Sequence, residues 1–310
     1  MKEQPLITVI TPVFNCPYLE TAIGSVMSQD YPHIQYIIVD DGSDSEDYTG
    51  LFEGIQENNH LDSLRVIRLA ENQGTVRALN AGIRESEGRY IFNLAADDVF
   101  TDEHVLSDWV EEFEETGSMV ITGIREVFDE TMRVRLRSAP SKKVRRKIFD
   151  SEPRELYRAM FDYNMIVGCC TAQSRECIDR YGPFDETYRI IEDYPRYLRL
   201  TREGVKIHFF DRSVVKYRLG GISSQGRFDE QYEKESDLIY DREIAPFAED
   251  GDRALERYGN WKKHMVLRKQ FFERYRNSSK LSALISYGIR DPLMAAQFVQ
   301  ERVLIRIHRD

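Results

Sequence analysis

The stretch YIIVDDGSDS, residues 36–45, decides the fold class of this chain. It opens with an apolar run typical of a strand buried on both faces, and it ends in aspartate, glycine and serine, which favour a turn. Other apolar runs of strand length alternate with runs whose apolar residues have helical spacing. The predicted strands are 6–11, 36–40, 64–69 and 90–94, and the predicted helices are 17–27, 76–85 and 105–113. This order predicts an α/β fold with a mostly parallel sheet and helices on both faces.

Polar residues gather where three of these predicted strands end. The first strand leads into TPVFN (11–15), the second ends in Asp40 and Asp41, and the fourth is followed by Asp97 and Asp98. Open α/β sheets bind ligands outside the carboxyl ends of their strands. Four carboxylates at one rim repel one another unless a cation or a donor-rich ligand lies among them, and a divalent metal is the simplest such cation. Each carboxylate taken singly is also explained by turn or N-cap chemistry.

Six motifs, in this order, carry a resemblance to a known family. They are ITVITPVFN (7–15), IIVDDGSDS (37–45), ENQGTVRALNAGI (71–83), GRYIFNLAADD (88–98), GPFDE (182–186) and IIEDYPRYLRL (190–200). Together they resemble the family 2 glycosyltransferases, which are inverting enzymes with the GT-A fold, over roughly residues 6–225. Each motif is weak alone, and their order and spacing make the resemblance specific. It implies a GT-A catalytic domain over residues 1–228 and leaves 229–310 as a C-terminal helical extension.

The resemblance implies a site for a nucleotide-diphosphate-sugar donor, typically a UDP-sugar. The donor-binding residues that it implies are Thr11, Pro12, Val13, Phe14, Asn15, Asp40, Asp41, Arg77, Asp97 and Asp98. The TPVFN turn would surround the nucleotide base, and Asp40 would accept a hydrogen bond from it. Arg77 would lie near the diphosphate, for which a guanidinium is suited. A structural explanation competes, because Arg77 also fits the solvated face of a helix.

The metal motif of the family is Asp-x-Asp, and the matching residues here are Ala95-Ala96-Asp97-Asp98. The first aspartate is therefore missing. Asp97 and Asp98 would act as a pair: one would bind Mn²⁺ or Mg²⁺, and the other would bind the ribose or hydrogen-bond to the ligands of the metal. The missing carboxylate also fits a weak or metal-poor site.

A second departure from the family follows the Tyr-Arg pair at residues 217–218. Many relatives have a histidine shortly after this pair that contacts the metal, whereas this chain has Gly220 and Gly221. A glycine loop there could close over the diphosphate through backbone N–H groups, or it could be a plain turn.

The ED motif supplies the catalytic residues that the resemblance implies. Asp193, with Glu192 beside it, matches the residue that deprotonates the acceptor hydroxyl. Inversion requires one such base on the side opposite the leaving group. Asp193 also precedes a predicted helix at 194–200, so it fits an N-cap as well, and the two roles are compatible. Acceptors in this family are growing surface polysaccharides or lipid-linked glycans.

The formal net charge of −10 is unevenly distributed. After Trp261 the chain has eleven basic and four acidic residues, so a basic tail follows an acidic body. This pattern argues against nucleic acid as a partner and favours one surface for an anionic partner such as a bilayer. Residues 280–310 mix basic and apolar side chains, which fits peripheral membrane contact or packing on the catalytic domain. The basic stretch 133–147 predicts a strand that leads into an exposed loop.

The remaining features narrow the class of protein. No stretch reaches the roughly eighteen apolar residues of a transmembrane helix, and the N-terminus lacks the pattern of a signal peptide. The expected location is therefore cytoplasmic, with membrane association as the alternative. The four cysteines have neither zinc nor disulfide spacing, which predicts packing residues. Two rival functions stay open: a nucleotidyltransferase, and a GT-A domain that binds a nucleotide sugar without catalysis.

Overall fold

The computed structural model describes residues 4–44, 48–57, 61–220 and 230–260. The chain divides into two compact units. The first comprises Met1–Glu126, Ser138–Arg158 and Asn164–Tyr217, and the second Val127–Arg137, Ala159–Tyr163 and Arg218–Asp310. The domain boundary expected at residue 228, the loop after Gly220 and the tail at 280–310 lie outside the described residues.

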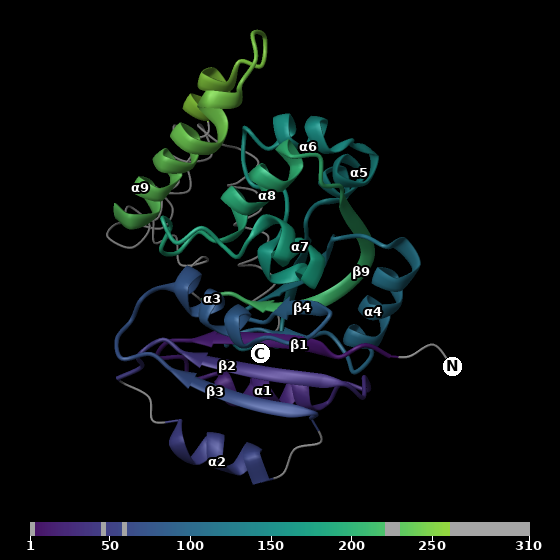
Figure 1. Ribbon diagram of the computed structural model, residues 1–310, viewed down its shortest axis with the longest axis vertical. Coiled ribbons are helices and arrows are strands. Elements are labelled where there is room, and N and C mark those ends of the chain that lie inside the picture. Colours follow the sequence, from purple (N-terminus) through teal and green to yellow (C-terminus); the bar gives the residue numbers. More distant parts are fainter. Residues whose placement is uncertain (1–3, 45–47, 58–60, 221–229, 261–310) are drawn as a thin grey trace. The chain divides into compact units, whose positions relative to one another are not determined.

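The described residues form a nine-stranded sheet (Figure 1). Its strands are β1 (Ile7–Val13), β2 (Ile34–Asp40), β3 (Ser63–Arg68), β4 (Tyr90–Asn93), β5 (Val99–Phe100), β6 (Val120–Phe128), β7 (Arg135–Ala139), β8 (Thr171–Ser174) and β9 (Ile207–Arg218). They lie in the order β3-β2-β1-β4-β8-β6-β9-β5, and β7 pairs with β6. The first four strands in this order run parallel, which confirms the prediction for them. Strand β8 is antiparallel to β4 and β6, and β5 is antiparallel to β9.

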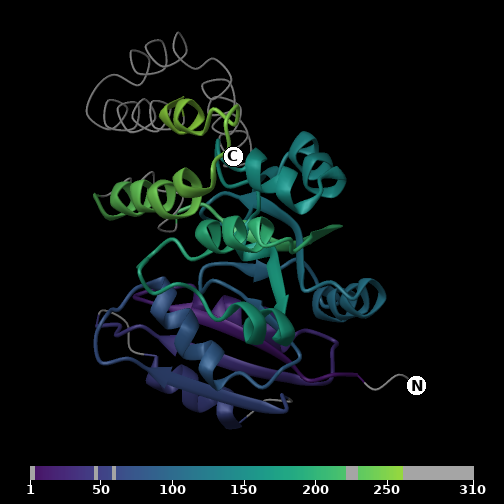
Figure 2. The same ribbon diagram turned by 45° about the horizontal axis from the view of Figure 1, so that its top comes forward.

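Helices cover both faces of the parallel strands. Helices α1 (Leu19–Met27), α2 (Thr49–Glu57) and α4 (Val105–Thr116) share one apolar core with alternate residues of β1, β2 and β4. Helix α3 (Thr75–Glu85) packs across β1 and β2 on the opposite face (Figures 1 and 2). Strand β2 is consequently buried at all seven residues, as its apolar sequence predicts.

The later part of the chain adds further helices to strands β6, β7, β8 and β9. Its helices are α5 (Lys142–Asp150), α6 (Pro153–Ala159), α7 (Arg175–Tyr181), α8 (Asp193–Arg202) and α9 (Glu230–Ile239), with short turns η1 (Gly168–Cys170), η2 (Tyr240–Ile244) and η3 (Ala245–Phe247). The described part of the expected C-terminal extension is thus helical at α9. Among the described helices, none combines the length and the apolar character that crossing a bilayer requires.

Helix α5 corrects one prediction from the sequence. The basic stretch 133–147 begins as a strand, as expected, but Lys142–Asp150 is a helix and not an exposed loop. Ser141 caps it by accepting a hydrogen bond from the N–H of Val144 over 3.5 Å. Ile148 is fully buried and anchors the helix. Lysine and arginine are good helix formers, so a charge run with one apolar anchor is compatible with a surface helix.

Candidate active site

The ends of β1 and β2 lie side by side at the rim of the sheet. Val13 pairs with Asp40 in the parallel register, and the N–H of Asp41 donates to the carbonyl of Val13 over 2.8 Å. Strand β4 ends at the same edge, where the N–H of Leu94 donates to the carbonyl of Ile10. The carboxyl ends of three parallel strands therefore meet, as the sequence predicts.

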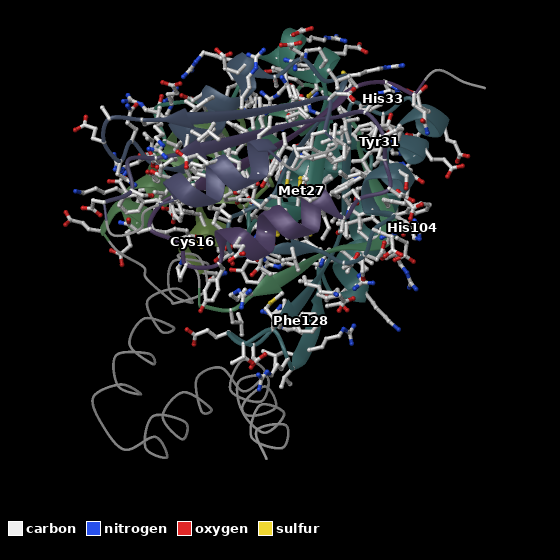
Figure 3. The ribbon with its side chains drawn as sticks, turned by 90° about the horizontal axis from the view of Figure 1, so that it is seen from below. Cys16, Met27, Tyr31, His33, His104 and Phe128 are labelled. Atoms are coloured by element: carbon white, nitrogen blue, oxygen red, sulfur yellow. The ribbon has the colours of Figure 1, made fainter. Side chains whose placement is uncertain are left out.

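Asn15 ties the turn after β1 to the turn after β2. Its backbone N–H donates to Oγ of Ser43 over 3.0 Å, and its side chain exchanges two hydrogen bonds with Asp44. Asn15 has φ of 47°, a left-handed conformation that asparagine tolerates better than most residues. The next residue, Cys16, lies at the end of α1 away from Tyr31 and His33 (Figure 3). The TPVFN and DDGSDS motifs, both expected to bind the nucleotide, are thus joined by hydrogen bonds.

Within TPVFN, the side chains divide between core and solvent. Thr11 and Val13 are buried, and the hydroxyl of Thr11 accepts a hydrogen bond from Tyr36 over 3.0 Å. Pro12 is half-buried, and Phe14 is 40% exposed. Phe14 is therefore the most exposed side chain of this turn, and its contact with a nucleotide base stays a prediction, while Thr11 and Val13 pack in the core.

Asp41 joins the end of β2 to the start of α3. Its Oδ1 accepts the N–H of Gln73 over 2.7 Å, and its Oδ2 accepts the N–H of Gly74 over 2.8 Å. Burial raises the pKa of Asp41, and these two bonds and the charge of Arg189 oppose that shift. Gly74 has φ of 93°, and a Cβ there would lie 2.5 Å from the carbonyl oxygen of Arg189. Asp41 therefore fixes the α3 start, whereas a direct contact with the donor stays a prediction.

Asp40 directly precedes Asp41, and Arg77 lies in the first turn of α3. Oδ1 of Asp40 accepts the N–H of Ser43 over 3.0 Å, so the carboxylate is held within its own turn. Nε of Arg77 lies 3.6 Å from Oε2 of Glu186, and the Arg77 side chain is 52% exposed. The neighbouring Asn80 donates to Oε1 of Glu186 over 3.0 Å. The QGTVRALN and GPFDE motifs are thus brought together in space.

The two aspartates after β4, Asp97 and Asp98, differ in burial. Asp97 is half-buried, whereas Asp98 is 0% exposed and its N–H donates to the carbonyl of Ala95 over 3.0 Å. Val99 then enters β5, which pairs with β9 at Lys216. Within the described residues, no group of three or more histidine, cysteine, aspartate or glutamate side chains is arranged to hold a metal.

The expected base, Asp193, is the first residue of α8, and Glu192 precedes it as the N-cap residue. Oδ2 of Asp193 accepts the side-chain amide of Asn164 over 2.8 Å, and Oδ1 accepts the N–H of Tyr194 over 2.6 Å. Burial raises the pKa of the Asp193 carboxyl, and these two bonds and the charge of Arg125 oppose the shift. The residue therefore bonds the first turn of its helix while its carboxyl stays more basic than usual.

A segment of two cysteines lies next to this base. Nη1 of Arg125 lies 4.0 Å from Sγ of Cys169, and the Sγ atoms of Cys169 and Cys170 are 3.8 Å apart. The negative charge of Asp193 raises the pKa of Cys169, and the negative charge of Asp98 raises the pKa of Cys170. The cysteine segment thus links the acidic residues after β4 with the start of α8.

Sequence reasoning did not identify the neighbours of the base. Arg125 lies on β6, with its guanidinium carbon 4.2 Å from the ring centroid of Tyr217 on β9. Asn164 lies in the connection before η1. Tyr217 belongs to the Tyr-Arg pair noted in the sequence, whereas Arg125 and Asn164 belong to none of the motifs that carry the resemblance. A lone arginine in a strand and a lone asparagine in a connection give no local signal.

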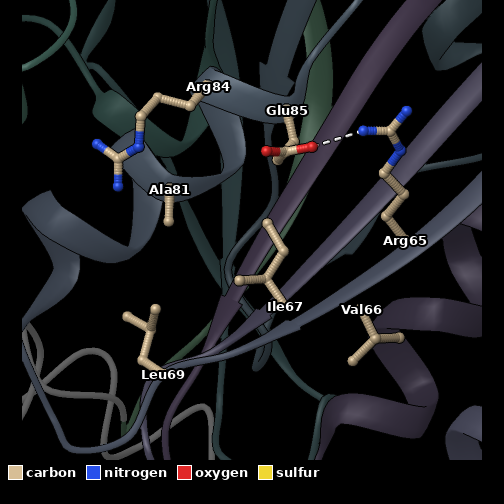
Figure 4. Close-up of a pocket in the computed structure, with 7 residues that line it drawn as sticks. All are labelled: Arg65, Val66, Ile67, Leu69, Ala81, Arg84 and Glu85. Carbon is tan, nitrogen blue, oxygen red and sulfur yellow. Dashed lines mark hydrogen bonds and ion pairs between the residues drawn. The ribbon is translucent and has the colours of Figure 1, made fainter.

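A cavity of about 460 Å³ lies elsewhere, between β3 and the second half of α3 (Figure 4). Arg65 and Glu85 close one side of it with an ion pair of 2.6 Å. None of the residues expected at the catalytic site lines this cavity. It is therefore separate from the carboxyl-end rim described above.

The fold is similar to the GT-A fold of solved glycosyltransferases. The mannosyltransferase PcManGT from Pyrobaculum calidifontis, solved in complex with GDP-Man and Mn²⁺, superposes with a TM-score of 0.61 at 15% identity, over 97% of this chain and 87% of that one. The family model "Glycosyl transferase family 2" matches residues 8–182, more than half of the chain. The chain therefore belongs to glycosyl transferase family 2, as its motifs indicated.

Two relatives match over most of their length. "Putative teichuronic acid biosynthesis glycosyltransferase TuaG" of Bacillus subtilis is 28% identical over 222 residues, which cover 70% of this chain and 80% of TuaG. "UDP-Glc:alpha-D-GlcNAc-diphosphoundecaprenol beta-1,3-glucosyltransferase WfaP" of Escherichia coli is 25% identical over 231 residues, which cover 73% of this chain and 82% of WfaP.

Proposed function

We propose that this chain is an inverting glycosyltransferase that moves a sugar from a nucleotide-diphosphate donor, a UDP-sugar, to a hydroxyl of a glycan or lipid-linked acceptor. The observation that carries the proposal is the Asp193 carboxylate at the start of α8, held by Asn164 and Tyr194. A fixed carboxylate with a raised pKa suits a general base that must take a proton from a hydroxyl.

In the proposed reaction, Asp193 accepts the proton of the acceptor hydroxyl as that oxygen attacks the anomeric carbon of the donor. The attack comes from the side opposite the nucleotide, so the configuration at that carbon inverts. Asn164 and Tyr194 orient the carboxylate, and burial keeps it basic enough to take the proton. Glu192, next to the base, completes the proposed catalytic pair.

The donor would lie along the rim formed by β1, β2 and β4. Phe14 offers an exposed ring for the nucleotide base, and Asp40 offers a carboxylate held in place by its own turn. The half-exposed guanidinium of Arg77 would bind the diphosphate in exchange for its 3.6 Å contact with Glu186. Asp41 would contribute indirectly, because its hydrogen bonds to Gln73 and Gly74 hold the start of α3 in place.

Asp97 and Asp98 fit a divalent metal whose remaining ligands come from the donor. Mg²⁺ in such sites uses one or two carboxylates together with substrate phosphates, and two carboxylates are what this chain offers. Asp98 is fully buried and Asp97 is half-buried. We therefore assign the direct metal contact to Asp97 and an indirect role around the metal to Asp98. A bound Mn²⁺ or Mg²⁺ would neutralise the charge that develops on the leaving diphosphate.

The comparisons support the substrate class. The name of WfaP specifies a UDP-sugar donor and a diphosphoundecaprenol-linked acceptor, and the name of TuaG specifies teichuronic acid biosynthesis. We therefore propose surface polysaccharide biosynthesis as the setting. A peripheral membrane contact through residues 280–310 would suit a lipid-linked acceptor.

The test is a panel of nucleotide sugars offered to the full chain with and without Mn²⁺. We expect binding of one or more UDP-sugars, and release of UDP that depends on Mn²⁺ and on a glycan or lipid-linked acceptor. A chain that binds a nucleotide sugar but never releases the nucleotide would be a binding module, and the transferase proposal would be wrong.

A further inference from the structure

We propose that Cys169 is a covalent modification site that accepts small disulfides and other soft electrophiles beside the Asp193 carboxylate. The site consists of the Cys169 thiol, the Cys170 thiol and the Arg125 guanidinium. It extends the proposed function, because that function uses none of these three side chains.

Of the two residues of the pair, only Cys169 has exposed surface. Cys170 is 0% exposed and packs in the core, whereas Cys169 is half-buried at the edge of that core. The described chain contains one other half-buried cysteine, Cys16, whose backbone N–H donates to the hydroxyl of Tyr48 over 2.7 Å. Exposure alone therefore predicts similar reactivity for Cys169 and Cys16, and any difference between them must come from their surroundings.

The surroundings of Cys169 favour its thiolate. Cys170 offers a hydrogen bond across the 3.8 Å between the two sulfur atoms, and Nη1 of Arg125 lies 4.0 Å from Sγ of Cys169. Against burial and the negative charge of Asp193, which both raise the pKa of Cys169, these two neighbours lower it to about 7, and Cys170 is the larger cause. A thiol whose pKa lies near the ambient pH is the most effective attacking group in disulfide exchange.

The Arg125 guanidinium is positioned to stabilise the Cys169 thiolate. Arg125 stacks on the ring of Tyr217, and its Nε is buried without a hydrogen-bond partner among the described residues. Its charge therefore acts on the nearby thiol and on Asp193, for both of which it lowers the pKa.

The chemical step is a thiol–disulfide exchange. The Cys169 thiolate attacks one sulfur of a disulfide RS–SR, a new Cys169–S–S–R bond forms, and the reagent S–S bond breaks. The leaving RS⁻ takes the electron pair of that bond and a proton from water. The cysteine sulfur is oxidised, and the released reagent sulfur is reduced, so the electrons balance.

The position of Cys169 gives the adduct a consequence. A Cβ on the preceding residue, Gly168, would lie 2.8 Å from Oδ2 of Asp193, so this segment touches the proposed base. An adduct on Cys169 therefore adds volume beside the carboxylate that must meet the acceptor. If Asp193 is the base, as the proposed function holds, the adduct lowers turnover.

The primary experiment treats the folded full chain with dithiobis(nitrobenzoate) and locates the adducts by peptide mass spectrometry. We expect Cys169 to react about threefold to tenfold faster than Cys16 at pH 7, because a larger thiolate fraction outweighs the lower nucleophilicity of a more acidic thiol. The ratio should rise as the pH falls below 7. Equal rates, or faster labelling of Cys16, would overturn the proposal.

Two variants test the cause. Cys169→Ser should remove the fast phase, and Cys16→Ser should keep it. Arg125→Met should slow the fast phase and move its pH midpoint upward, with thermal unfolding of the variant as the check on folding. If Arg125→Met does not fold, the pH dependence of labelling in the intact chain decides: a midpoint near 7 supports the proposal, and a midpoint near the 8.5 of an ordinary thiol contradicts it.

Turnover separates this proposal from the proposed function. Labelling should leave donor binding unchanged, lower turnover, and be reversed by dithiothreitol, and Cys169→Ser should be insensitive. Selective labelling in a chain without transferase activity would retain the modification site and reject the function. Turnover without selective labelling of Cys169 would retain the transferase function and reject the modification site.

Discussion

The side-chain amide of Asn164 donates a hydrogen bond to Oδ2 of Asp193 over 2.8 Å. It stabilises the ionised carboxylate, whereas burial favours the neutral form and is the larger influence, so the pKa of Asp193 lies above its usual range. A general base works only while it is ionised, and its strength grows with its pKa. In the proposed mechanism, Asn164 therefore extends toward lower pH the range in which the Asp193 carboxylate is ionised.

Asn164→Ala should move the acidic limb of the turnover profile to higher pH, because the carboxylate loses a donor that favours its charged form. At a pH on that limb we expect turnover to fall about tenfold, the equivalent of about 1.4 kcal/mol for one hydrogen bond to a charged group. The measurement is turnover against pH with saturating donor. A profile that keeps its shape and position would show that Asn164 does not act on the base.

Gly168→Ala should impair the base without unfolding the chain. A Cβ at Gly168 would lie 2.8 Å from Oδ2 and 3.0 Å from Cβ of Asp193, so the carboxylate must shift. We expect turnover to fall about 10²-fold, the scale seen when a reacting group is misplaced by about 1 Å, with donor binding unchanged. The matched control is Gly24→Ala in α1, where a Cβ meets nothing within 4 Å. Equal turnover in the two variants would contradict the placement of the site.

The parallel strands could be predicted because their sequences are continuously apolar, and β2 is buried at every residue. The rim could be predicted as well, because parallel strands end at the same edge and Asp40 and Asp97 follow apolar runs. Helix α5 is hard to predict because its apolar side is narrow: only Val144 and Ile148, one turn apart, interrupt a run of lysine and arginine on the buried side.

The neighbours of the base could not be predicted, because long-range pairing creates them. Arg125 reaches Cys169 from β6, and β6 lies beside β8 only through the antiparallel order of the second half of the sheet. No local spacing in the sequence reports that order. Asn164 likewise meets Asp193 across 29 residues of chain.

Asp97→Asn should weaken donor binding because it removes the carboxylate assigned to the metal. We expect a loss of about tenfold to 10²-fold in the presence of Mn²⁺, and a similar loss for the intact chain in EDTA. The control is Asp179→Asn, which removes an exposed carboxylate on α7. Calorimetric titration with a UDP-sugar is the measurement. Donor affinity that is indifferent to both treatments would make Asp97 structural and the site independent of metal.

Asp41→Asn should destabilise the fold more than Asp40→Asn. Asp41 accepts the N–H groups of Gln73 and Gly74 from a distant segment, and the amide of asparagine can satisfy only one of them. We expect its free energy of unfolding in urea to fall by about 1–3 kcal/mol. Asp40 accepts the N–H of Ser43 within its own turn, so its variant should mainly lose donor affinity. The opposite pattern would exchange the two roles.

The central claim is that Asp193 takes the proton of the acceptor hydroxyl. Its most direct test compares the intact chain with Asp193→Asn under single-turnover conditions, with donor binding measured in parallel. The account predicts that the variant binds the UDP-sugar with nearly unchanged affinity and transfers the sugar roughly 10²-fold to 10⁴-fold more slowly. Transfer at a near-normal rate in a variant that binds the donor normally would show that Asp193 is not the base.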